Sequence, residues 1–122
     1  MTSDKTSYMK LADIKETLRA EVIVGQDKLN LSVETGCASD LMSDLLRGPT
    51  NGAVLLTGLN NIQVIRTSVI SGVVAVILIR DKKPTPEMTS LAVEHGLPVL
   101  STPFTMFSSC GRLFAKGLRG VE

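Results

Sequence analysis

The stretch AVLLTGLNNIQVIRTSVISGVVAVILIRDKKPTPEMTSLAVEHGLPVLST (residues 53–102) decides the fold. It contains three apolar strands, each followed by a turn and then a helical pattern, which is typical of a parallel sheet with helices on its faces. The strands are predicted at 53–58, 73–79 and 98–102. The turns after them then share one edge of the sheet: 57–61, 80–83 and 101–103. In open α/β sheets this carboxyl edge is where ligands bind.

The helices after these strands carry recognisable start signals. Asn60 or Asn61 can cap the first helix, and Thr85 followed by Pro86 is a strong start for the second. The first helix is expected to place Ile62, Ile65 and Val69 on one face. The last helix is expected to bury residues at helical spacing: Met106, Phe107, Cys110, Leu113 and Phe114.

The front of the chain follows another pattern. Leu11, Ile14 and Leu18 recur at the spacing of a short amphipathic helix over 10–20, and 21–25 is a short apolar strand. Residues 28–33 (KLNLSV) alternate strictly between apolar and polar, which predicts a strand at a sheet edge or in a small second sheet, and the turn residues 25–27 suit a hairpin with 21–25. Residues 38–48 read as a helix that Ser39 or Asp40 caps and whose inward residues are Leu41, Met42 and Leu45.

The strand at 73–79 has no polar residue, so both of its faces must be covered and it belongs in the sheet interior. We therefore predict one compact α/β domain over residues 9–122, with a parallel or mixed central sheet and helices on its faces. Residues 1–8 are polar and are expected to form a disordered tail.

Composition excludes several classes of function. The 122 residues carry a formal net charge of +1, which is too weak a field to collect nucleic acid or an anionic membrane. The longest apolar run, 73–79, is far shorter than the ~20 residues of a membrane helix. With two cysteines and 43% hydrophobic residues, a disulfide framework is not expected. We predict a cytoplasmic protein that binds neither nucleic acid nor membranes.

The leading candidate site is TGLNNIQ (residues 57–63). Gly58 lets the backbone approach a ligand, and N–H groups at the following helix start favour an anion. Arg66 could pair with a phosphate or carboxylate. The predicted ligand-binding residues are Thr57, Gly58, Asn60, Asn61, Gln63, Arg66, Thr67, Ser101 and Thr102. An alternative of equal weight is that Gly58 only forms a turn and that Asn60 or Asn61 only caps the helix.

No catalytic or metal constellation stands out. The 57–63 stretch is neither a Walker A loop nor a dinucleotide-binding fingerprint. Asp40, Ser43 and Asp44 share a helical face, but capping and solvation explain them better than acid–base work. Cys37 and Cys110 lack the spacing of a metal site, although Cys37 before a helix start could have a lowered pKa. For His95 the sequence offers no nucleophile that it could activate as a general base. We therefore assign no catalytic residue, cofactor or metal.

The succession of these motifs resembles the DRTGG domain family over residues 9–118. The segments that carry the resemblance are 37–46, 55–68, 73–84 and 97–113. The resemblance implies an α/β domain similar to the N-terminal domain of HPr kinase/phosphatase, but no kinase activity, since that activity needs a separate P-loop domain. Other members are appended to phosphate acetyltransferases, to cobyrinate-synthase-like ATPases or to CBS domains of a regulated pyrophosphatase. Stand-alone members accompany hydrogenase and redox genes, so the implied role is regulation or assembly.

The chain departs from the family pattern at its central motif. Many members have a second Gly after Thr-Gly and an acidic–basic pair before Ile-Gln. Here Leu59 follows Gly58, and Asn60-Asn61 precede Ile62. A charged ligand contact known from such members is therefore not carried over to this chain.

Two functions remain open. In the first, the domain is a non-catalytic regulatory module that binds a small molecule, such as an adenine nucleotide, at the carboxyl edge. In the second, it is a scaffold that forms a homodimer or docks onto an enzyme subunit without a small ligand. The apolar residues Val64, Ile65, Val69 and Ile70 wrap more than one helical stripe, which favours the second. An enzyme is the least favoured reading.

Overall fold

The computed structural model describes residues 8–121. A mixed six-stranded sheet with strand order β2-β7-β6-β5-β4-β8 forms its centre, and β1 and β3 form a separate two-stranded ribbon. The strands are β1 (Met9–Lys10), β2 (Glu21–Val24), β3 (Ser32–Val33), β4 (Thr35–Ala38), β5 (Ala53–Thr57), β6 (Ala75–Leu78), β7 (Val99–Ser101) and β8 (Arg119–Gly120). The helices are α1 (Leu11–Thr17), the 3-10 turn η2 (Gln26–Lys28), α2 (Met42–Leu45), α3 (Ile62–Ser71), α4 (Pro86–His95) and α5 (Met106–Ala115).

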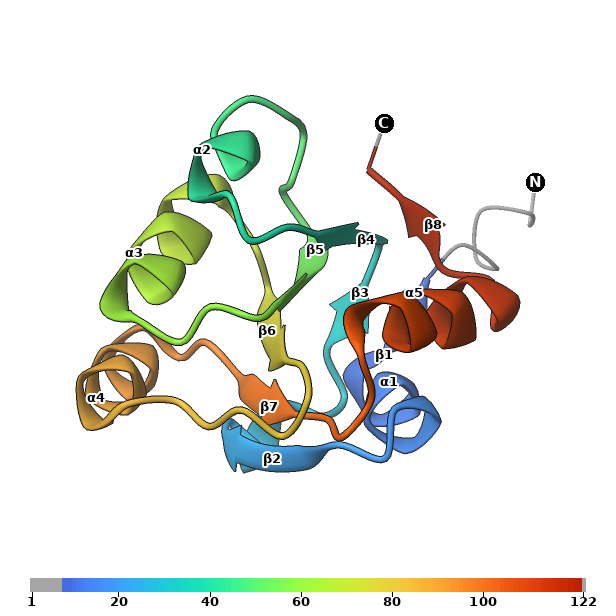
Figure 1. The fold of residues 1–122 in the computed structure, drawn as a ribbon, viewed down its shortest axis with the longest axis horizontal. Coiled ribbons are helices and arrows are strands. Elements are labelled where there is room, and N and C mark those ends of the chain that lie inside the picture. The colour runs from blue at the N-terminus through green and yellow to red at the C-terminus, as the bar shows by residue number, and fades with distance from the viewer. Residues whose placement is uncertain (1–7, 122) are drawn as a thin grey trace.

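The helices cover the sheet from both sides. α2, α3 and α4 lie on one face, and α1 and α5 lie on the other (Figure 1). Side chains alternate between the two faces along β5, so that Leu55 joins the core under α3 and α4 while Val54 and Leu56 join the core under α1 and α5. The predicted single α/β domain with a mixed sheet is confirmed.

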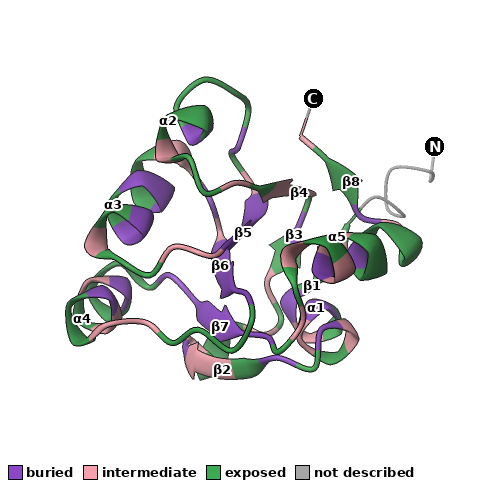
Figure 2. Ribbon diagram, in the orientation of Figure 1, coloured by how far each residue is buried: buried purple, intermediate pink, exposed green. Residues whose placement is uncertain are grey.

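The central strand is where the sequence placed it. β6 lies between β5 and β7, runs parallel to both, and is buried along its whole length (Figure 2). The only antiparallel pairing in the described six-stranded sheet joins the edge strand β2 to β7. The carboxyl ends of β5, β6 and β7 therefore meet at one edge, as predicted for parallel strands.

The predicted strand at 28–33 is confirmed only at Ser32–Val33, which lies in a small second sheet, and the predicted hairpin with 21–25 is wrong. Gly25 has a φ of 92°, and the chain turns there through η2. Leu29 and Leu31 follow this turn and contact the start of α1. Their backbone carbonyls accept the first N–H groups of that helix. Only Ser32–Val33 is extended, and it pairs with β1. The alternation of apolar and polar residues over 28–33 therefore reflects packing of Leu29 and Leu31 against the core beside α1, not pairing in the main sheet.

The predicted helix at 38–48 shrinks to one turn. β4 ends at Ala38, residues 39–41 are irregular, and α2 spans only Met42–Leu45. Neither Ser39 nor Asp40 caps it in the predicted way, because the N-cap is Leu41 and makes no side-chain cap bond. Leu41 is 60% exposed rather than inward, whereas Leu45 is buried as predicted.

The start signals of α3 and α4 are confirmed. The Asn61 side chain accepts the Gln63 N–H at 3.0 Å, and Thr85 caps α4 with Pro86 following. The apolar faces fit less well. In α3 the buried side is formed by Val64, Ile65 and Ser68, while Val69 is 37% exposed. In α5 Leu113 is buried, but Phe107 and Phe114 are exposed, which contradicts the prediction.

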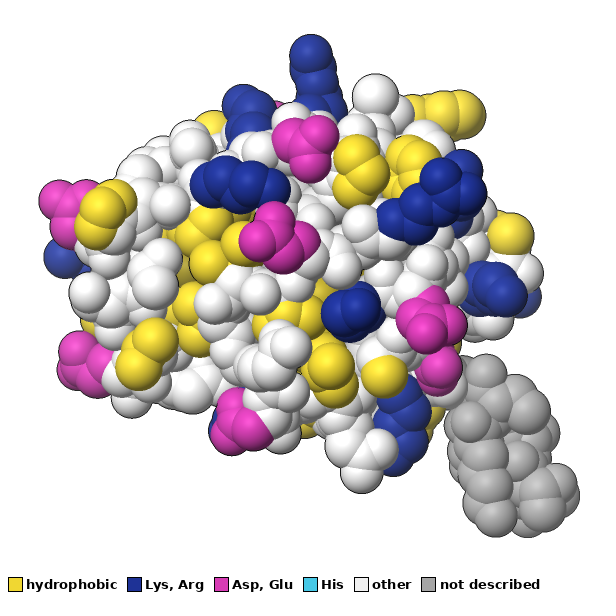
Figure 3. Space-filling view, turned by 90° about the horizontal axis from the view of Figure 1, so that it is seen from below, with side chains coloured by type: hydrophobic (Ala, Val, Ile, Leu, Met, Phe, Trp, Pro, Cys, Tyr) yellow, Lys and Arg dark blue, Asp and Glu magenta, His cyan; other side chains and the backbone are white. Residues whose placement is uncertain are grey.

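The surface carries no dominant sign of charge on the side viewed from β2, where basic and acidic side chains are interspersed with small apolar patches (Figure 3). This agrees with the net charge of +1. Across residues 8–121 we find no helix with both the length and the apolar character needed to cross a bilayer. The predicted tail at 1–8 lies outside the described residues except for Tyr8, which is exposed.

Candidate functional site

Three turns are tied together at the carboxyl edge of the sheet. The Ile79 N–H donates to the Thr57 carbonyl at 3.1 Å, and the Thr102 N–H donates to the Leu78 carbonyl at 2.9 Å. The Asp81 N–H then donates to the Thr102 carbonyl at 2.8 Å. The ends of β5, β6 and β7 thus form one continuous hydrogen-bonded rim, and the predicted residues of 57–61 and 101–102 lie on it.

An aspartate of the chain occupies the anion position at Gly58. One carboxylate oxygen of Asp40 accepts the Gly58 N–H at 2.7 Å and the Thr57 hydroxyl at 2.9 Å. The Thr57 hydroxyl oxygen in turn accepts the Leu59 N–H at 3.2 Å. The sequence pointed to this cradle as a place for a ligand anion, and the protein fills it with its own carboxylate. Asp40 is a rim residue that the sequence analysis did not connect with Gly58, because it assigned Asp40 to helix capping and solvation.

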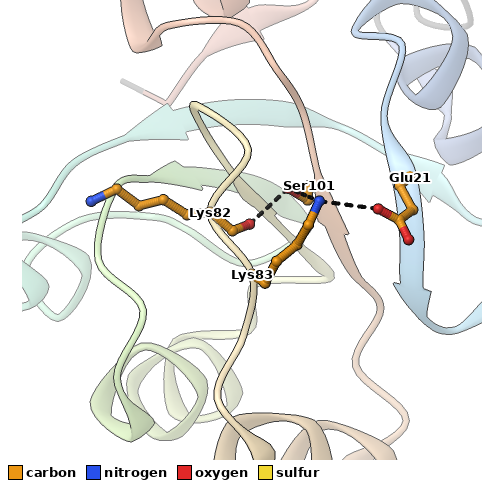
Figure 4. A network of polar contacts seen from close by, with 4 residues as sticks. All are labelled: Glu21, Lys82, Lys83 and Ser101. Atoms are coloured by element: carbon orange, nitrogen blue, oxygen red, sulfur yellow. Dashed lines mark hydrogen bonds and ion pairs between the residues drawn. The ribbon is translucent and has the colours of Figure 1, made fainter.

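Ser101 and Thr102 are built into the scaffold of the rim. Both are buried; the Ser101 hydroxyl donates to the Lys82 carbonyl at 2.7 Å, and the Thr102 hydroxyl donates to the Leu18 carbonyl at 2.6 Å. The Lys83 ammonium lies 3.1 Å from Glu21 and 3.4 Å from the Ser101 hydroxyl. In this network the Lys82 side chain points away from the other three residues (Figure 4). These bonds fix the 80–83 turn and leave the Lys82 ammonium directed elsewhere.

A groove of about 700 Å³ opens between the N-terminal half of α3 and one side of α4. Three predicted ligand-binding residues line it, namely Asn60, Asn61 and Arg66. The Asn60 amide also donates to the Lys83 carbonyl at 3.0 Å, which joins the groove to the rim. Its α4 wall is lined by Thr85, Pro86, Glu87, Ser90, Leu91 and Glu94. In the described lining, Arg66 is the cation and Glu87 and Glu94 are the carboxylates. The volume is in the range of small-molecule sites.

The remaining predicted residues lie outside this groove. Thr67 is buried on α3, and Gln63 is exposed. Thr57 and Gly58 face Asp40, as described above. Of the nine predicted residues, four are rim residues bonded within the protein (Thr57, Gly58, Ser101 and Thr102), three line the groove, and Gln63 and Thr67 belong to neither group.

The turn after β6 is strained. Arg80 and Asp81 have φ values of 58° and 62°, and the Lys82 N–H closes the turn on the Ile79 carbonyl at 3.1 Å. Two consecutive left-handed residues are the signature of a type I′ turn, which favours Asn and Gly. Each non-glycine residue held in this region costs about 1–2 kcal/mol. Such strain concentrates at functional sites.

We expect Arg80→Asn combined with Asp81→Gly to stabilise the protein by about 1 kcal/mol, because these residues adopt positive φ with less strain. Urea unfolding followed by circular dichroism measures the gain. Lys82→Gly is the matched control, since Lys82 has no positive φ and glycine there only adds unfolded-state freedom. A double variant no more stable than the wild type would show that the turn is not strained.

The two cysteines are both free and half-buried. Both line a cavity beside β4, yet Cys37 packs with the core under α3 and α4, and Cys110 packs with the core under α1 and α5. Burial raises the pKa of Cys37, with Asp44 adding to the effect, and burial raises the pKa of Cys110. Cys37 lies in a strand rather than before a helix start, so a lowered pKa is excluded and both thiols stay protonated at neutral pH. Within residues 8–121 no three His, Cys, Asp or Glu side chains gather as metal ligands would.

The comparisons with known proteins identify the family. A family model described as the DRTGG domain matches residues 13–114, so the chain belongs to the DRTGG domain family. The chain is similar to the crystal structure of the CBS and DRTGG domains of the regulatory region of Clostridium perfringens pyrophosphatase, complexed with the activator diadenosine tetraphosphate. The TM-score is 0.73 at 20% identity, over 95% of this chain and 50% of that chain. This likeness shows a shared fold, and the chain spans about half of that regulatory region. A search of curated proteins found no match.

Proposed function

We propose that this DRTGG domain is a non-catalytic regulatory module that binds an adenine nucleotide in the groove between α3 and α4. The observation that carries the proposal is the groove of about 700 Å³ beside the carboxyl edge, lined by Asn60, Asn61 and Arg66. Side-chain amides can bond the edge of an adenine base, and a guanidinium can bond a ribose or phosphate oxygen. The activator bound in the pyrophosphatase complex, diadenosine tetraphosphate, belongs to the same chemical class.

Charge decides how the nucleotide would lie. Glu87 and Glu94 line the α4 wall of the groove and would repel phosphates placed deep between the helices. The base and ribose therefore suit the groove. The phosphates would extend toward the 80–83 turn, which the Asn60 amide contacts and whose Lys82 ammonium points away from the internal network. In this arrangement the other predicted residues support the site without contacting the nucleotide: Thr57, Gly58, Gln63, Thr67, Ser101 and Thr102.

A thermal-shift and calorimetric titration of the full chain tests the proposal with adenosine, AMP, ATP, diadenosine tetraphosphate and inorganic phosphate. A ligand at a hundred times its Kd stabilises the fold by about 2.7 kcal/mol, which is a shift of several degrees. We expect a shift with at least one adenine compound, lost in Asn60→Ala and Arg66→Ala and kept in the control Lys116→Ala just after α5. No shift with any adenine compound would contradict the proposal.

A second candidate is a scaffold that forms a homodimer or docks onto an enzyme subunit. It is favoured by Ile70, which is 76% exposed at the end of α3. Sedimentation equilibrium that shows a dimer lost in Ile70→Ser would support it. The link to hydrogenase or redox metabolism and the cytoplasmic location stay predictions from the resemblance and the composition.

A further inference from the structure

The outer side of α5 presents two phenylalanines to solvent. Phe107 is 89% exposed and Phe114 is 60% exposed. They are two helical turns apart, so they lie on the same side of the helix. Between them lies Gly111, where an added Cβ would meet no atom within 4 Å. Together Phe107, Gly111 and Phe114 form an apolar strip, called here the α5 strip, with a low centre that another helix could approach closely.

An apolar cavity adjoins this strip. It has a volume of about 170 Å³ and lies between α5 and the sheet edge formed by β4 and β8. Its walls include Ala38, Leu56, Cys110, Leu113, Phe114 and Leu118. An engineered apolar cavity of about 150 Å³ in another protein binds benzene, so a space of this size can receive one ring or one branched aliphatic side chain.

Two arginines, Arg112 and Arg119, lie beside the strip. Arg119 is the charged residue in the described cavity lining, and its guanidinium lies 4.5 Å from the Phe114 ring centroid. Arg112 follows Gly111 on α5, whereas Lys116 lines a separate hollow with Asp13 and Glu16 of α1. Among residues 8–121 the one ion pair joins Lys83 to Glu21, so Arg112 and Arg119 make no ion pair with a described carboxylate. The charge favours an acidic partner.

We propose that the α5 strip and its cavity dock an acidic amphipathic helix of a partner protein. One apolar side chain of that helix enters the cavity, and its flanking carboxylates meet Arg112 and Arg119. A second copy of this chain fits less well, because a two-fold contact across α5 sets each set of cations against the same set in the other copy. This inference is independent of the nucleotide groove, which lies on the opposite face of the sheet.

The test is an NMR titration of the full chain with two synthetic helical peptides. Both carry Leu along one face, and the remaining positions are Glu in one peptide and Lys in the other. We expect the Glu peptide to shift the amide signals of Phe107, Cys110, Phe114 and Ala38, and its binding to weaken as salt is raised. The double variant Phe107→Ser, Phe114→Ser should weaken binding about thirtyfold, as for hot-spot aromatics. Arg119→Glu should weaken binding of the Glu peptide and improve that of the Lys peptide.

Val93→Ser is the matched control, because Val93 is 63% exposed on α4, across the sheet. It should leave binding of the Glu peptide unchanged. The proposal is overturned if neither peptide shifts the α5 signals or if both bind equally well. It is also overturned if sedimentation shows dimers that Phe107→Ser dissolves, or if a single-stranded oligonucleotide binds this face in preference to the Glu peptide.

Discussion

Ile77→Ala should lower the free energy of unfolding by about 2–5 kcal/mol, the largest effect expected for a single substitution that leaves the backbone unstrained. Ile77 is fully buried in the central strand, between Leu56 of β5 and Leu100 of β7 in register. Its side chain belongs to the core under α1 and α5. Truncation removes apolar burial and leaves a cavity that rigid neighbours on both strands cannot fill.

Ile70→Ala is the matched control, because it makes the same chemical change at a side chain that is 76% exposed on α3. It should change stability by no more than about 0.5 kcal/mol. Urea unfolding of both variants, followed by circular dichroism, measures the difference. Equal losses in the two variants would show that the core of the sheet is not centred on β6.

The sequence predicted well those parts of the fold in which the local residue pattern agrees with the tertiary packing. β6 has no polar residue, and this alone places it inside the sheet with both faces covered. Asn61 and Thr85 cap helices through bonds to residues two or three positions away, so their signal lies within a single turn of sequence.

The missed strands lack such a local signal. β4 is Thr-Gly-Cys-Ala, with small residues that show no apolar period, and it becomes a strand through its pairing with β5 and β8. Gly36 packs closely there, because a Cβ would lie 3.0 Å from the end of the Leu118 side chain, which would have to move aside. Neither helical nor strand periodicity in the sequence predicts the contact between Gly36 and Leu118, which are far apart in the chain.

The error on α5 concerns the width of its buried side. Helical spacing correctly predicted that Leu113 faces the core, but the same pattern included Phe107 and Phe114 at the margin of the stripe. Sequence gives the direction of a helical face and not how far neighbouring elements cover it. The candidate site shows the same limit, since Asn60, Asn61 and Arg66 line a groove whose other wall comes from α4.

Asp40→Ala should cost about 2 kcal/mol of stability, because it removes the acceptor for two hydrogen bonds at the end of β5. The Thr57 hydroxyl is buried and would lose its partner, while the Gly58 N–H is more open to water. Asp40→Asn keeps an acceptor oxygen but loses the charge, so it should cost about half as much. Asp27→Ala is the control, since Asp27 is exposed and should change stability little. Urea unfolding of the three variants measures the series.

The same substitution should change anion binding. In the wild type the Asp40 carboxylate lies where a ligand anion would meet the Gly58 N–H, so inorganic phosphate should not bind there. Asp40→Ala removes that competitor and exposes backbone donors just before α3, a favourable place for an anion. We expect phosphate to stabilise Asp40→Ala more than the wild type and to shift the Gly58 amide signal only in the variant. Equal phosphate shifts of Gly58 in both proteins would contradict this account, and the phosphates of a nucleotide could then occupy the cradle directly.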